Sequence, residues 1–171
     1  PDQVGQFIRC WFKHNLALAE RLRTELDKSG RERIKDAVKN PLRLALLCRT
    51  WTLGQGGLPN TKAGLYQQFV EALYEWKQEQ FPTSSTQRQE LNQALGELAK
   101  RAIAEEKTKF RLRHRLVREI LGEPDAKLFK LALQLGFLNQ VGVAAEAKNQ
   151  GEKVYAFYHP TFQEYFAAQA I

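Results

Sequence analysis

The chain has 171 residues, of which 43% are hydrophobic, enough apolar material for one ordinary domain or two small ones. It shows neither a secretory signal pattern nor an apolar run near the ~20 residues that cross a bilayer, so we expect no membrane partner. The net charge of +7 comes mostly from one segment, which holds these six cations and no acid: Lys107, Lys109, Arg111, Arg113, Arg115 and Arg118.

Apolar residues at helical spacing predict a bundle of helices over residues 1–82. The expected helices, in chain order, are one capped by Asp2, one that ends near Gly30, a short one before Asn40, a buried one over 41–51 and a long one over 61–80. Cys10 and Cys48 both fall in apolar helical patterns, so we expect two buried free thiols and a reducing, cytoplasmic compartment.

The polar stretch FPTSST (81–86) is the best candidate for an internal boundary. Directly after it, Thr86 and Gln89 have the spacing of a capping box at the start of a further helix. Farther along the chain, Asp125 is the expected cap of another helix, and Gly136 is its expected end.

Two strand-like runs, over 137–141 and 154–158, follow three expected helices. Three helices and then a hairpin is the element order of a winged helix. The sequence therefore predicts a mainly α protein, in which a helical bundle over 1–82 is followed by a winged-helix unit with a small β-hairpin over 83–171.

Residues suited to catalysis are few. The three histidines, His14, His114 and His159, stand at no metal-ligand spacing to a cysteine or a carboxylate, so we expect no metal site. The sequence contains neither a phosphate-binding glycine loop nor a nucleophile elbow. We therefore expect that this chain is not itself an enzyme.

Two residues are candidates for contact with a ligand. His159 lies where a strand gives way to a helix, and the free N–H groups of a helix start attract anions, so its imidazole could donate a hydrogen bond to a phosphate. Pro41 begins the buried helix, and its flat ring could lie against a purine. Each residue also has a purely structural interpretation, His159 as a helix cap or core residue and Pro41 as a helix start.

Three stretches, in the order NPLRLALLCRTW, LPNTKAGLYQQFVEAL and FYHPTFQEYFAA, resemble the NACHT family of STAND signal-transduction NTPases. This family is related to animal NOD-like receptors and plant resistance proteins. The resemblance runs along nearly the whole chain and begins with DQVGQFIRCWF. It implies a fragment that follows a nucleotide-binding core and consists of a helical domain and a winged-helix domain.

The resemblance also implies roles for the two candidate residues. Pro41 would correspond to the adenine-packing proline of the family, and His159 to the histidine that contacts the β-phosphate of bound ADP in the closed state. The P-loop and the Mg²⁺-binding acids would lie in an upstream domain of the same chain, so the parent protein would be an ATPase. Exchange of ADP for ATP would open the protein and allow homo-oligomers to form. The fragment alone should bind ADP or ATP weakly or not at all.

The alternative function is that of a nucleic-acid-binding winged helix, because the fold permits it and the basic segment suits phosphates. Against it, the expected helix after Asp125 offers only Lys127, Lys130 and Gln134 outward. A third possibility is a scaffold or oligomerisation domain whose association ignores nucleotide. The basic segment could equally be a solvated surface, or could pair with an acidic neighbouring domain.

Overall fold

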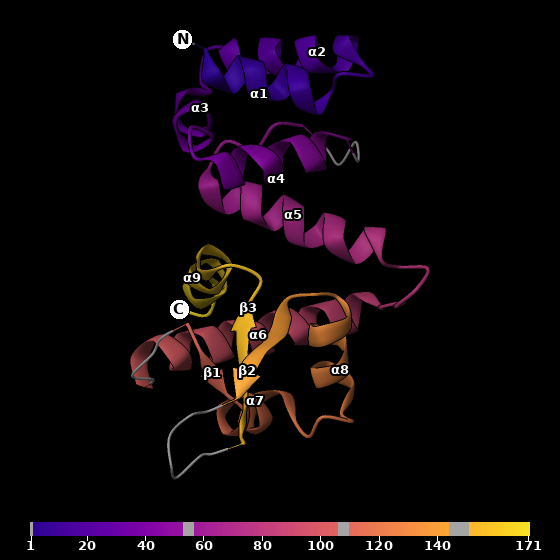
Figure 1. The fold of residues 1–171 in the computed structure, drawn as a ribbon, viewed down its shortest axis with the longest axis vertical. Coiled ribbons are helices and arrows are strands. Elements are labelled where there is room, and N and C mark those ends of the chain that lie inside the picture. Colours follow the sequence, from indigo (N-terminus) through magenta and orange to yellow (C-terminus); the bar gives the residue numbers. More distant parts are fainter. Residues whose placement is uncertain (1, 53–56, 106–109, 144–150) are drawn as a thin grey trace. The chain divides into compact units, whose positions relative to one another are not determined.

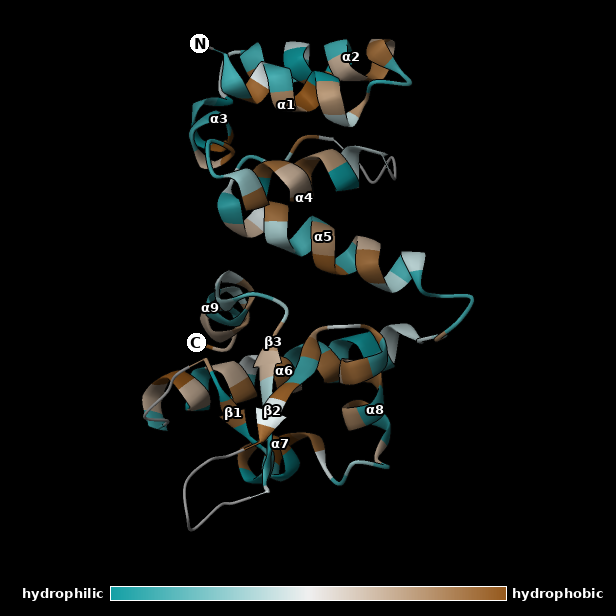
Figure 2. Ribbon diagram, in the orientation of Figure 1, coloured by the Kyte–Doolittle hydropathy of each residue, from teal (hydrophilic) through white to brown (hydrophobic). Residues whose placement is uncertain are grey.

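The computed structural model describes residues 2–52, 57–105, 110–143 and 151–171. The protein is mainly helical, with one small antiparallel sheet, and it divides into two compact units, residues 1–75 and 76–171 (Figure 1). Figure 2 shows apolar and polar residues interleaved along the helices, as amphipathic helices require.

The division between the units lies after Glu75, earlier in the chain than the expected boundary after residue 82. Side chains attach the intervening segment to the second unit. Lys77 donates from Nζ to the carbonyl of Gln134 (3.2 Å), and Arg88 donates to Thr83 Oγ1 (2.8 Å) and to Gln78 Oε1 (2.9 Å). A polar composition marks this segment as a connection, and these hydrogen bonds link it to the second unit.

The first unit is built from helices α1 (Gln3–Trp11), α2 (Leu16–Asp27), α3 (Glu32–Ala37), α4 (Pro41–Thr52) and α5 (Lys62–Trp76). Polar side chains cap four of them, including α5, where Thr61 Oγ1 accepts from the N–H of Gly64 (3.0 Å). Asp2 Oδ1 accepts from the N–H of Gly5 (2.9 Å), which confirms the expected cap of α1. Asn15 caps α2, and Asn40 accepts from two N–H groups of the first turn of α4 (3.0 and 3.3 Å). The last helix is shorter than expected, since it ends at Trp76 and not near residue 80.

The cysteines differ in their surroundings. Cys48 is fully buried on α4, and this burial raises the pKa of its thiol to about 12, so the thiol stays protonated at neutral pH. Cys10, in contrast, is exposed, and the expectation that it is buried was wrong. It lies on α1 two residues after Ile8, which faces the core, and a helical step of two residues turns a side chain away from that face.

The second unit contains α6 (Ser85–Glu105), β1 (Leu112–Arg113), α7 (His114–Leu121), α8 (Lys127–Gln134), β2 (Leu138–Val143), β3 (Lys153–Phe157) and α9 (Pro160–Gln169). The strands form an antiparallel sheet in the order β1-β3-β2, with Leu112 opposite Tyr155 and Leu138 opposite Phe157. The two strands of the hairpin were expected within two residues of these bounds. The two-residue strand β1 was not expected.

Two expected helix caps are wrong in this unit. The capping box of α6 is made by Ser84 and Gln87, where Ser84 Oγ accepts from the N–H of Gln87 (3.1 Å) and Gln87 Oε1 accepts from the N–H of Ser84 (2.9 Å). The helix begins at Ser85, so Thr86 already lies inside it. Helix α8 begins after Ala126, without a side-chain cap, so Asp125 does not cap it. Gly136, with φ of 85°, ends α8 as expected.

Helix α9 packs closely along α6, and Gly96 makes this approach possible. A Cβ atom at residue 96 would lie 3.0 Å from the carbonyl oxygen of Phe166 and 3.1 Å from Cβ of Ala170. Any larger side chain must therefore push the two helices apart.

Gly96→Leu is expected to destabilise the second unit by about 1–3 kcal/mol, the usual cost of overpacking a core. The matched control is Gln93→Leu, which adds the same side chain to an exposed position of α6. Urea unfolding of both variants measures the difference. Equal stability of the two variants would contradict the close approach of α9 to residue 96.

The cap of α1 gives a pH-dependent expectation. The hydrogen bond from Gly5, and after it the bond and charge of Arg23 (3.2 Å), lower the pKa of the Asp2 carboxyl below its ordinary value of 3.8. A lowered folded-state pKa means that the stabilisation is complete above pH 3.8 and is lost as the pH falls through the folded-state value.

Asp2→Asn keeps an acceptor for the cap but removes the charge, so this variant is expected to lose less stability than the wild type below pH 3.8. Trp11 and Trp51 both lie in the first unit, so acid unfolding can be followed by their fluorescence. Identical acid transitions of the two proteins would show that Asp2 is not held ionised by its contacts.

Candidate functional site

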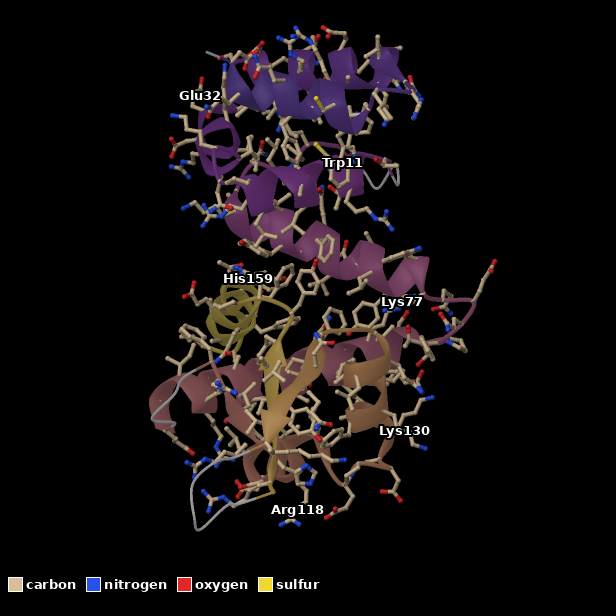
Figure 3. All side chains as sticks on the ribbon, viewed as in Figure 1. Trp11, Glu32, Lys77, Arg118, Lys130 and His159 are labelled. Atoms are coloured by element: carbon tan, nitrogen blue, oxygen red, sulfur yellow. The ribbon has the colours of Figure 1, made fainter. Side chains whose placement is uncertain are left out.

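His159 lies at the junction of β3 and α9, where it occupies the N-cap position of the helix (Figure 3). Its backbone is extended, with φ of −154° and ψ of 150°, and its carbonyl accepts from the N–H of Phe162 (2.9 Å). Pro160 fills the first helical position, as expected, where an N–H is not needed. The strand before it is held in register, because the N–H of Tyr158 donates to the carbonyl of Phe137 (3.0 Å).

The imidazole of His159 is half-buried and folds back onto its own helix. Nδ1 accepts from the backbone N–H of Thr161 (3.2 Å) and lies 3.0 Å from Thr161 Oγ1. The side chain thus caps the helix, which is one of the two roles that the sequence allowed. Within the residues that the structure describes, Nε2 makes no hydrogen bond, so this edge of the ring can meet a ligand.

Apolar contacts of α9 hold this histidine in place. Phe162 lies edge-on to Tyr158 (ring centroids 5.4 Å apart), and Phe166 lies edge-on to Phe137 (5.8 Å) and near Phe157 (5.9 Å). Phe162 and Phe166 are both buried. The first turn of α9, and with it His159, is therefore fixed to the sheet by a cluster of aromatic rings.

Pro41 belongs to the first unit, where it is exposed at the start of α4. It lies on the wall of a cavity of about 560 Å³, a volume in the range of small-molecule sites. The other lining residues come from all four of the first helices and the segments beside them: Asp2, Gln3, Val4, Gly5, Phe7, Ile8, Arg23, Leu26, Asp27, Lys35, Lys39 and Leu44.

The cavity has an apolar wall and a charged rim. Its cations are paired with acids, since Lys35 bonds Asp27 (2.6 Å) and Lys39 bonds Asp36 (3.2 Å). Sequence reasoning identified Pro41 but missed the cavity, because its residues are scattered from 2 to 44 and only the folded helices bring them together.

The basic segment is only partly within the described residues, because Lys107 and Lys109 lie outside them. Arg111 is exposed just before β1, and Arg113 in β1 is half-buried. Arg115 and Arg118 are exposed on α7, where Figure 3 labels Arg118. Two acidic side chains lie close to the described part of this segment. Glu123 lies 3.7 Å from Arg118, and Glu152 accepts from the backbone N–H of Arg115 (3.0 Å). The surface is therefore less purely cationic than the sequence pattern indicates.

The other two histidines do not join His159. His14 is exposed after α1. His114 lies among aromatic rings, with Phe129 at 5.8 Å and Tyr155 at 6.0 Å, and its Nδ1 is 3.4 Å from the Tyr155 hydroxyl. Burial raises the pKa of Tyr155, so its hydroxyl stays protonated at neutral pH. These contacts give His114 a packing role in the second unit.

No group of three or more His, Cys, Asp or Glu side chains that could hold a metal ion occurs among the described residues. In the same part of the chain, no helix has the length and apolar character to cross a membrane. A comparison with protein-family models found no match, and neither did a comparison with curated proteins.

Proposed function

We propose that this chain is the regulatory part of a nucleotide-gated signalling switch of the NACHT type, and that His159 senses the phosphate of bound ADP. The observation that carries this proposal is the state of His159. Its Nδ1 is occupied by the first turn of α9, while Nε2 has no partner among the described residues and can donate to a phosphate oxygen.

The second unit is proposed to be a winged-helix domain. Its elements follow one another as helix, strand, two helices, two strands and a final helix, and its sheet has the order β1-β3-β2. This order supports the assignment more strongly than the sequence does, because β1 supplies the strand that the sequence pattern lacked. His159 follows the last strand of this arrangement.

The proposed switch uses two contacts from this chain. The wall of the cavity at Pro41 offers an apolar surface to the adenine ring, and His159 donates a hydrogen bond to the β-phosphate of ADP in the closed state. An upstream domain of the same chain supplies the P-loop, the Mg²⁺ and any ATPase chemistry, and this part is not itself an enzyme. Loss of the histidine contact on exchange for ATP favours the open, oligomeric form.

The test uses the natural protein, including any sequence that precedes residue 1. The protein is purified and denatured, and the released nucleotide is identified by chromatography. One ADP per chain is the expected result. A protein that carries no nucleotide, and takes up none when ADP is added, would leave His159 with only its role as a helix cap.

A second candidate function, a nucleic-acid-binding winged helix, is favoured by the exposure of Arg111, Arg115 and Arg118 on the second unit. Each phosphate contact makes the affinity for DNA fall as salt rises. Binding by this function should therefore be steeply salt-dependent, and Arg111→Ala, Arg113→Ala and Arg115→Ala together should flatten that dependence. Fluorescence anisotropy with duplex DNA measures it. Binding that is absent at low salt, or unchanged by the three substitutions, would exclude this function.

A further inference from the structure

Two donors of the same residue converge on one nitrogen of His159. The backbone N–H of Thr161 lies 3.2 Å from Nδ1, and the hydroxyl oxygen of Thr161 lies 3.0 Å from it. Thr161 is the second helical residue of α9, and it is the first residue of the helix that has an N–H to offer, since Pro160 has none.

The backbone contact fixes the direction of both bonds. An amide N–H can only donate, so Nδ1 must carry a lone pair and no proton. A neutral imidazole has one N–H and one acceptor nitrogen, so its proton lies on Nε2. The Thr161 hydroxyl faces the same lone pair, and it therefore donates as well. The tautomer of a histidine is set by the hydrogen bonds of its other nitrogen, and here a single residue supplies both of them.

We propose that Thr161 is a positioning residue for His159, which fixes the ring and holds its proton on Nε2. His159 then presents one outward N–H donor. The partner of that N–H is an acceptor oxygen, such as a phosphate oxygen, and not a metal ion, which would need a lone pair at Nε2. That the oxygen belongs to a nucleotide rests on the proposed function, whereas the tautomer and the role of Thr161 do not.

The experiment measures the tautomer directly in the ¹⁵N-labelled chain of 171 residues. Long-range ¹H–¹⁵N correlation spectra at about pH 9, above the usual histidine range, report which ring nitrogen carries the proton. His14, which is exposed, serves as the internal reference for an unconstrained ring. We expect a larger excess of the Nε2–H tautomer for His159 than for His14. An Nδ1–H tautomer, or the same ratio at both residues, would overturn the proposal.

Two variants separate the hydroxyl from the rest of the side chain. Thr161→Val keeps the shape and the backbone N–H but removes the hydroxyl, and it should shift the tautomer ratio of His159 roughly 2- to 12-fold toward Nδ1–H, the effect of one neutral hydrogen bond. Thr161→Ser restores a hydroxyl and should restore the wild-type ratio. An unchanged ratio in Thr161→Val would show that the hydroxyl does not position the ring.

The same variants in the natural protein distinguish the two proposals. Faster ADP release from Thr161→Val than from Thr161→Ser, together with the tautomer shift, supports both. A tautomer shift in a protein that binds no nucleotide supports the role of Thr161 and overturns the proposed function. Stoichiometric ADP in the natural protein, with a tautomer ratio that Thr161→Val does not change, supports the proposed function and overturns the role of Thr161.

Discussion

His159→Ala in the natural protein is expected to speed the release of bound ADP roughly 10- to 150-fold. A hydrogen bond to a charged group contributes about 1.5–3 kcal/mol, and each ~1.4 kcal/mol is a factor of ten in affinity. Such a contact biases a two-state switch toward its closed form without locking it. The variant should therefore also raise the basal signalling activity. Stopped-flow displacement of a fluorescent ADP analogue measures the release rate.

Removal of His159 also removes the cap of α9, and this structural effect needs its own control. His159→Asn supplies that control, because asparagine is a favourable N-cap whose side-chain oxygen can accept from the first turn. It lacks the donor at the position of Nε2, so it should release ADP as fast as His159→Ala while α9 stays intact. Slow release from His159→Asn, at the wild-type rate, would mean that the cap and not the Nε2 donor retains the nucleotide.

The helices could be predicted from the sequence because their apolar spacing matches the helical period over several turns. The position of His159 between a strand and a helix could be predicted because Pro160 suits the first helical position and would disrupt a helix interior. Strand β1 could not be predicted, because two residues are too few to show an alternating pattern. Leu112 is a strand residue because it pairs with Tyr155, which lies far away in the sequence.

Local capping rules predicted the type of cap before α6, a hydroxyl side chain with a glutamine three residues later, but not the residue at which it lies. FPTSST offers several hydroxyl side chains as caps, and Ser84 and Thr86 each have a glutamine three residues later. The residue spacing is the same for both pairs, so only the structure shows that the helix begins at Ser85 and that Ser84 caps it. For α9 the position of the cap was predicted correctly, but its atomic contacts were not. The contacts between His159 and Thr161 are local, but only the structure shows which ring nitrogen they use.

Phe166→Ala is expected to destabilise the second unit by about 3–5 kcal/mol, the largest effect on stability among the changes considered. The Phe166 side chain is 2% exposed and meets Phe137 and Phe157, so its removal leaves a cavity between α9 and the sheet. A domain is stable by only about 5–15 kcal/mol, so this loss is a large share of the total. Amide hydrogen exchange in β3 and α9 should speed up roughly 150- to 5000-fold when it proceeds through unfolding of the unit.

The matched control is Glu164→Ala, an exposed position of the same helix where alanine also improves helix propensity. Its exchange should stay within a few-fold of the wild type. Because His159 is the N-cap of α9, Phe166→Ala should also weaken the cap and let the His159 tautomer ratio approach that of His14. If exchange in α9 rises without any change at His159, the aromatic cluster stabilises the helix but does not position the histidine, and the link between packing and the candidate site would be wrong.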